Sequence, residues 1–130
     1  MSCPCGGVPA SANYDACCGR YHVGEQHLQA PTPEALMRSR YSAYALGLVD
    51  YVRDTWHAST RPGTLARFDA ADKWLGLEIK DAPRAIDDEG FVEFVARNKP
   101  KGGGAASRLH ERSRFVREGG RWFYIDGVIL

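Results

Sequence analysis

All four cysteines of this 130-residue chain lie within its first 18 residues, as one Cys-Pro-Cys pair and one adjacent pair (Cys3, Cys5, Cys17 and Cys18). The segment 1–31 that holds them is rich in small residues and has no long apolar periodicity, so it cannot bury much core alone. Four thiolates at this spacing can close a tetrahedral site around a zinc-type cation, with each sulfur about 2.3 Å away. Metal binding would supply the missing folding free energy. The sequence therefore predicts one zinc ion held by the four cysteines.

The sequence leaves two other states of the four thiols possible: free surface cysteines, and a disulfide that joins the two pairs after oxidation. Both are disfavoured in a cytosolic chain, where thiols are kept reduced and clustered cysteines more often bind metal. His22 follows Cys18 by four residues and could replace a cysteine as ligand, with an ordinary surface histidine as the alternative. A closed cage of four thiolates has no open position for water, so we expect a structural rather than a catalytic zinc ion.

The overall composition restricts location and partners. Lys and Arg total 17 against 16 Asp and Glu, a net charge of +1, so neither nucleic acid nor anionic lipid is an expected partner. No apolar run approaches the roughly 18 residues of a membrane span, and the N-terminus lacks the basic and apolar regions of a signal peptide. We therefore expect a cytoplasmic protein without a membrane partner. One arginine cluster is predicted to form a solvated or ion-paired face: Arg108, Arg112, Arg114, Arg117 and Arg121.

Helices are predicted in the first half of the chain. The start of a helix is indicated at Thr32 and Pro33, because threonine can cap free amides and proline at the first helical position loses no hydrogen bond. The apolar residues that follow recur at helical spacing, and Gly47 ends or bends this helix. A second, shorter helix capped by Asp50 is expected to stop near His57, and a third is predicted over residues 64–73. The apolar stripe of the first helix consists of Met37, Tyr41, Tyr44 and Leu48.

The second half of the chain has the period of strands. Leu75, Leu77 and Ile79 alternate with polar residues and glycine, as in a half-buried strand. The run 91–97 is apolar on both faces and is predicted to be a central strand. Helices followed by an antiparallel meander give an α+β fold. The remaining strands are predicted over 84–86, 106–116 and 121–125, with turns at the glycine-rich stretches between them.

Several motifs together resemble a known family. Cys3-Pro4-Cys5-Gly6 with Cys17-Cys18-Gly19 resembles the SEC-C zinc motif found at the C-terminus of the bacterial secretion ATPase. With the segments that follow, the chain resembles the YchJ family of bacterial SEC-C proteins along nearly its whole length. These segments are residues 37–44, 55–57, 74–77, 91–97, 111–115 and 122–127.

The resemblance implies an N-terminal SEC-C-type zinc knuckle over residues 1–31 and a nuclear-transport-factor-2-like (NTF2-like), cystatin-like domain over 32–130. In that fold, helices pack into the concave side of a curved antiparallel sheet and form a cone. The SEC-C pattern places the metal ligands on Cys3, Cys5, Cys17 and Cys18. The spacer between the two cysteine pairs is longer than usual and lacks the typical lysines, and the family carries no established biochemical activity.

A cone-shaped fold can enclose a pocket between its helices and its sheet. We expect Tyr41, Tyr44 and Trp56 to line a pocket between the helices and the sheet, with His57 and Glu111 as candidate acids or bases. The alternative is structural: Glu111 pairs with an arginine, and His57 caps or ends its helix. Large aromatic residues such as Trp56, Trp74 and Trp122 are also the usual material of a small core. Motifs for nucleotide hydrolysis, dinucleotide redox chemistry and zinc proteolysis are absent from the sequence.

The sequence supports three candidate functions for the protein. A metal-stabilised protein-interaction module is favoured, because the most specific feature is a knuckle without a catalytic vacancy; it requires a protein partner. The alternative is a binder of a small molecule, or an enzyme, that uses the cone pocket. A thiol redox protein is the third, disfavoured because the cysteines lack the Cys-x-x-Cys spacing and zinc would occupy the sulfurs.

Overall fold

The structure is a computed structural model and describes residues 1–63, 73–99 and 105–130. Its helices are η1 (Tyr14–Ala16, a 3-10 turn), α1 (Gly19–His22), α2 (Pro33–Leu46) and α3 (Val49–Asp54). The strands are β1 (Lys73–Asp81), β2 (Glu89–Lys99), β3 (Ser107–Glu118) and β4 (Arg121–Ile129). They form one antiparallel sheet in the order β1-β2-β3-β4. The predicted α+β fold, with its meander and a central strand at 91–97, is confirmed.

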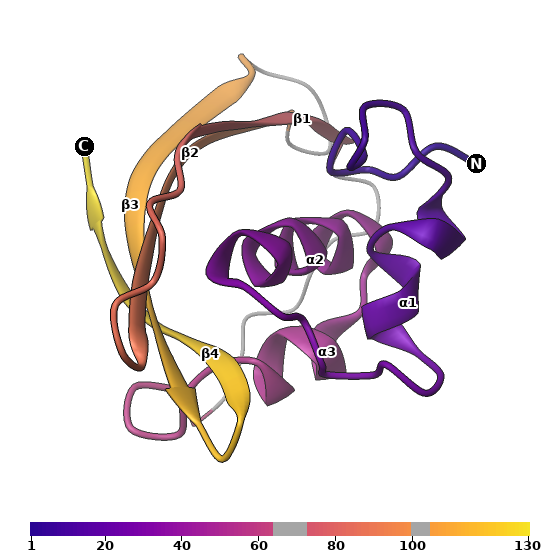
Figure 1. Cartoon of the computed structure of the whole chain (residues 1–130). Coiled ribbons are helices and arrows are strands. Elements are labelled where there is room, and N and C mark those ends of the chain that lie inside the picture. The colour runs from indigo at the N-terminus through magenta and orange to yellow at the C-terminus, as the bar shows by residue number, and fades with distance from the viewer. Residues whose placement is uncertain (64–72, 100–104) are drawn as a thin grey trace.

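Helix α2 has the predicted ends. The side chain of Thr32 accepts a hydrogen bond from the backbone N–H of Ala35, and Pro33 occupies the first turn. Gly47 ends the helix in the left-handed conformation, with φ of 74°, which glycine adopts without steric cost. The sheet curves around this helix, so that α2 lies in its concavity (Figure 1).

Two details of the predicted elements differ from the structure, and a third lies almost entirely outside the described residues. Helix α3 starts at Val49 after Leu48, without a side-chain cap, and Asp50 instead lies in its first turn within 3.2 Å of Arg53. The segment 84–86 is no strand, because only Ile86 forms an isolated bridge, with Glu89, across a tight turn. The helix predicted over 64–73 falls on residues outside the described part, apart from Lys73, which begins β1.

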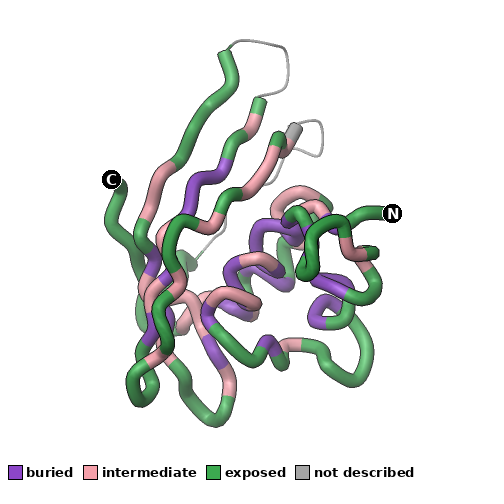
Figure 2. The backbone as a smooth tube through the Cα atoms, turned by 45° about the horizontal axis from the view of Figure 1, so that its top comes forward, coloured by how far each residue is buried: buried purple, intermediate pink, exposed green. Residues whose placement is uncertain are grey.

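The core lies between α2 and the sheet and continues to the other side of α2. Leu36, Val52, Val92 and Phe115 are fully buried at its centre. The four cysteines belong to the same cluster of buried residues, and Figure 2 shows buried positions on the sheet, on α2 and in the N-terminal segment. Helix α2 is therefore covered on one side by the sheet and on the other by the cysteine-containing segment.

Candidate metal centre and ligand cavity

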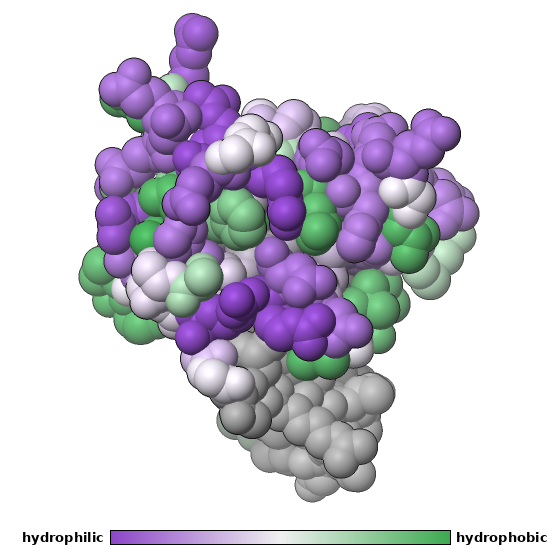
Figure 3. All heavy atoms as spheres, turned by 90° about the horizontal axis from the view of Figure 1, so that it is seen from below, coloured by the Kyte–Doolittle hydropathy of each residue, from purple (hydrophilic) through white to green (hydrophobic). Residues whose placement is uncertain are grey.

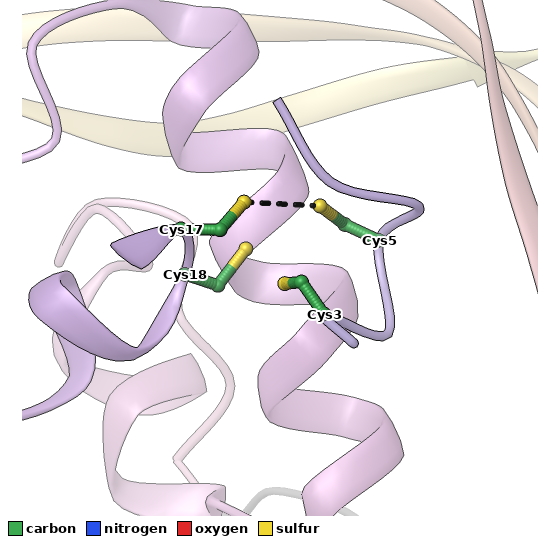
Figure 4. A group of neighbouring side chains, drawn as sticks. All are labelled: Cys3, Cys5, Cys17 and Cys18. Carbon is green, nitrogen blue, oxygen red and sulfur yellow. Dashed lines mark hydrogen bonds between the residues drawn. The ribbon is translucent and has the colours of Figure 1, made fainter. Parts of the chain in front are cut away.

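The four cysteine sulfurs converge on one point. Their Sγ atoms all lie within 4.8 Å of one another, and all four residues are buried. Cys3 and Cys5 come from the N-terminal loop, Cys17 ends η1, and Cys18 precedes α1. Figure 4 shows the side chains directed toward a common centre, with the Sγ atoms of Cys5 and Cys17 3.6 Å apart.

The donors fit a zinc ion. A tetrahedron with zinc–sulfur distances of about 2.3 Å has sulfurs about 3.8 Å apart, a spacing compatible with the observed cluster. Glycines allow the backbone segments around the four cysteines to pack closely against each other. Gly7 has φ of 86°, and a Cβ there would collide with the backbone N of Ala12. A Cβ on Gly19 would lie 2.8 Å from the ring of Tyr14. The predicted site for a tetrahedral soft-metal ion is thus geometrically available.

The thiols share their protons unequally. Hydrogen bonding from Cys18, and then from Cys5, lowers the pKa of Cys3. Hydrogen bonding to Cys3 and Cys5, together with burial, raises the pKa of Cys18. An ionised Cys3 therefore disfavours the ionisation of Cys18, and a divalent cation would relieve this repulsion by neutralising charge at the centre.

The cage docks on α2 through polar contacts. The Sγ of Cys3 lies 3.5 Å from the hydroxyl of Ser42. Arg38 donates from Nη1 to the backbone oxygen of Cys5 over 3.1 Å, and its Nε donates to Glu34 over 2.8 Å. The same Nη1 lies 3.9 Å from the Sγ of Cys5, so a cation faces the sulfur-rich site.

His22 is not a surface histidine, and both of its ring nitrogens are engaged away from the four sulfurs, so it does not replace a cysteine as ligand. It is only 6% exposed, and its Nδ1 lies 2.6 Å from the hydroxyl of Tyr14 while its Nε2 lies 2.8 Å from the backbone oxygen of Ser39. Since a carbonyl only accepts, Nε2 carries the proton and Nδ1 accepts from Tyr14. The ring also stands edge-on to Tyr51, with centroids 4.6 Å apart. The interpretation as an ordinary surface histidine was wrong, because this side chain joins the N-terminal segment to α2.

A cavity of about 360 Å³ opens between α2 and the concave face of the sheet. It contains four of the five predicted pocket residues: Tyr41, Tyr44, Trp56 and Glu111. Backbone pairing of the segment after α3 with β4 positions Trp56, since His57 N–H donates to Tyr124 O and Tyr124 N–H donates to Thr55 O. The remaining walls are Met37, Arg40, Trp74, Phe94, Ala96, Leu109, Ser113 and Tyr124.

Arg40 is the cavity residue that the sequence reasoning missed. It is 4% exposed, and its Nη1 donates to the backbone oxygen of Val52 and to the hydroxyl of Thr55. Its guanidinium lies over the ring of Tyr124, 4.7 Å from the centroid. Burial lowers the pKa of Arg40, yet a guanidinium stays charged in proteins. The signal was available, because Arg40 falls three residues after Met37 on the apolar stripe.

Within the described part of the chain, Glu111 is held by hydroxyl groups and pairs with no arginine, in contrast to the structural alternative. Its Oε2 accepts from the hydroxyl of Ser113 at 2.5 Å and from that of Tyr124 at 3.5 Å. Gly127 on β4 makes room for this carboxylate, because a Cβ at that position would collide with Oε2. Burial, followed by the charge of Glu111, raises the pKa of Tyr124 to about 12.

His57 lies outside the cavity. Its Nδ1 is 2.7 Å from the hydroxyl of Ser59, and its Nε2 is 2.6 Å from Oε2 of Glu118. His57 and Glu118 border a second depression of about 310 Å³ that also contains Arg61 and Arg121. Figure 3 shows the face that carries α3 and the β3–β4 turn, where hydrophilic residues predominate and hydrophobic ones occur in separate small groups. His57 therefore does not join Glu111 in one site.

Two members of the arginine cluster, Arg114 and Arg117, form ion pairs. Arg114 forms two hydrogen bonds with the carboxylate of Asp126, at 2.9 and 2.7 Å, and Arg117 pairs with Asp88 at 2.9 Å. Strand β4 continues through Asp126 to Ile129, beyond the predicted end at residue 125. No helix in the described ranges is long and apolar enough to cross a membrane.

Comparison with known proteins agrees with these features. The model of a family described as "YchJ, middle NTF2-like domain" matches residues 32–127. A UPF0225 protein of Chromobacterium violaceum is 55% identical, covering 98% of this chain and 93% of its own length. A UPF0225 protein of Bordetella pertussis is 53% identical, covering 98% and 92%.

Two solved structures share the fold. The solution structure of a SEC-C motif containing protein from Rhodopseudomonas palustris has a TM-score of 0.77 and 35% identity, covering 100% of this chain and 99% of that one. The crystal structure of a SEC-C motif containing protein from Psychrobacter arcticus has a TM-score of 0.76 and 28% identity, covering 100% and 83%. By its sequence and its fold, this chain belongs to the YchJ family, with the family's NTF2-like domain over residues 32–127.

Proposed function

We propose that this protein is a small-molecule-binding protein whose N-terminal segment is held in place by one structural zinc ion. The observation that carries the proposal is the cavity of about 360 Å³ with aromatic walls and the buried cation of Arg40. A hollow of this size with few polar groups among aromatic rings is typical of ligand sites.

The zinc ion has a structural role in this proposal. All four donors are cysteines and all are buried, so a metal held by them would have no open position for substrate or water. Cys3 and Cys5 contact Ser42 and Arg38 of α2, whose other residues line the cavity. Zinc would thus fix the helix that forms one wall of the ligand site.

The binding function is tested by filling the cavity. Ala96 is 5% exposed and lines the cavity, whereas the next residue, Arg97, is exposed. We expect 2-naphthalenemethanol, an uncharged aromatic probe, to bind the zinc-loaded chain and the Arg97→Phe control, and Ala96→Phe to abolish binding.

The readout is a two-dimensional amide NMR spectrum. The indole N–H signals of Trp56 and Trp74, which line the cavity, should shift, while that of Trp122, which does not, should stay. Binding that survives Ala96→Phe, or a shift of the Trp122 signal alone, would place the probe elsewhere and contradict the proposal.

A second candidate function is the binding of a protein partner by the N-terminal segment. It is supported by the exposure of apolar residues there, since Val8 is 49% and Val23 74% exposed. A double variant with aspartate at both positions should lose a partner that the wild-type chain captures. Equal capture by both chains would contradict this function.

A further inference from the structure

The cavity contains the buried positive charge of Arg40, which no acidic side chain in residues 1–63, 73–99 and 105–130 neutralises directly. Among the described residues, no carboxylate oxygen lies within 4.0 Å of Arg40, although arginines elsewhere in the chain form such pairs at 2.7 to 3.3 Å. Removing a charge from water costs free energy unless a partner compensates it. An anionic ligand group would supply that partner.

The hydrogen-bonding capacity of Arg40 is only partly used. Both hydrogen bonds found for it in the described part of the chain start from Nη1, to Val52 and Thr55. A guanidinium has five N–H donors in a planar fork, and those on Nε and Nη2 match the two oxygens of a carboxylate. The rings of Tyr124 and Trp56 hold the guanidinium plane, with centroids 4.7 and 5.4 Å away.

The rest of the cavity suits a flat apolar body. Tyr41 and Trp74 stand edge-on, with centroids 5.5 Å apart, and Phe94 and Ala96 close the wall on β2. One buried polar atom here, Nε1 of Trp56, has no hydrogen-bond partner in the described residues. Aromatic rings of a ligand would stack against such walls.

Glu111 is a second charged side chain in the wall of the cavity. Tyr124 lies between the two charges, with Arg40 over its ring and Glu111 at its hydroxyl. In the described residues, the hydrogen bonds found for Glu111 use Oε2 alone, so Oε1 is available to accept from a ligand. An anion beside Glu111 would be repelled, which confines the acidic end of a ligand to Arg40.

We infer that the cavity binds a planar aromatic acid that carries a hydroxyl or amino donor, with its carboxylate on Arg40 and its donor on Glu111. The inference rests on the proposed binding function and names the ligand class for the same site. Arg40 selects the acid, and Glu111 sets the direction in which the ring enters.

A probe series on the zinc-loaded full chain tests this assignment without relying on any variant. We expect 2-naphthoate to bind at least about tenfold more tightly than 2-naphthalenemethanol, because a bidentate charge-assisted contact replaces a neutral one. 6-Hydroxy-2-naphthoate should bind more tightly than 2-naphthoate. Dissociation constants come from the shifts of the Trp56 and Trp74 indole signals.

Variants then assign the two contacts. Arg40→Met should remove the preference for 2-naphthoate over the alcohol, and Glu111→Gln should reduce the advantage of the hydroxyl group while leaving 2-naphthoate bound. Arg112→Met is the matched control, since Arg112 follows Glu111 on β3 but packs over Phe91 and should change neither ratio.

The outcomes separate the inference from the function on which it rests. If the alcohol binds as tightly as 2-naphthoate and both shift the cavity signals, the site binds aromatic molecules but the assignment of an acid is overturned. If 2-naphthoate is preferred equally by Arg40→Met and the wild type, Arg40 does not select the acid. If no probe shifts the signals of Trp56 and Trp74, the proposed binding function itself fails.

Discussion

Replacing His22 with leucine tests whether the cysteine-containing segment is fastened to the domain. The substitution keeps an apolar side chain of similar size but removes the hydrogen bonds with Tyr14 and with the backbone oxygen of Ser39, at 2.6 and 2.8 Å. Each is worth about 0.5–1.5 kcal/mol net, and the edge-on contact with Tyr51 adds about 0.5–1.5 kcal/mol. We therefore expect a loss of about 1.5–4.5 kcal/mol in the free energy of unfolding.

The measurement is urea unfolding of the zinc-loaded chain at neutral pH, followed by tryptophan fluorescence. His27→Leu is the matched control, because His27 lies five residues further along the chain and is exposed; we expect a change within about 0.5 kcal/mol there. A second readout is the rate of zinc transfer to a coloured chelator, which should rise in His22→Leu alone. If both variants lose the same stability, His22 does not fasten the segment and the reasoning is wrong.

Three further predictions follow from the same structure. Burial lowers the pKa of His22 below its usual 6.5, so its contribution to stability is complete above pH 6.5 and falls as the pH drops below it; an NMR titration that shows a midpoint at or above 6.5 would contradict this. Burial raises the pKa of Tyr51 and of Tyr124 to about 12, so stability should decline between pH 10 and 12, because these tyrosines ionise at lower pH in the unfolded chain than in the folded one. An ultraviolet titration of the folded chain should detect tyrosines that ionise only near pH 12, and in denaturant this delayed ionisation should disappear. Gly127→Ala should push Glu111 off Ser113 and cost about 1–3 kcal/mol by overpacking, whereas an unmoved Glu111 carboxylate in the crystal structure of the variant would show that the glycine is not needed there.

Local signals in the sequence were sufficient to predict the fold. Each of these signals depends on chemistry within a few residues: the N-cap of α2 at Thr32, the end of α2 at Gly47 in the left-handed conformation, and the alternation of apolar residues over 75–79. The short elements were harder: Asp50 is a good capping residue, yet α3 begins at Val49. There, packing of Tyr51 and Val52 into the core decides the start instead of the cap.

The candidate site was predictable only in part. The clustering of four cysteines indicated the metal centre, because ligands close in sequence are brought together by one loop and one turn. The docking of that centre on α2 was not visible, since the pairing of Arg38 with the backbone of Cys5 joins residues 33 positions apart. The position of Arg40 on the apolar stripe indicated burial, but the contact of its side chain with α3 and its place beside Tyr124 in the cavity are visible only in the folded structure.

The central claim is that Cys3, Cys5, Cys17 and Cys18 form one closed metal site that fastens the N-terminal segment. The most direct test is X-ray absorption at the zinc edge, on protein purified without added metal and with its zinc content determined. The account predicts one zinc per chain with four sulfur neighbours at about 2.3 Å. A folded, metal-free chain with four titratable thiols, or a zinc shell in which nitrogen or oxygen replaces sulfur, would contradict it.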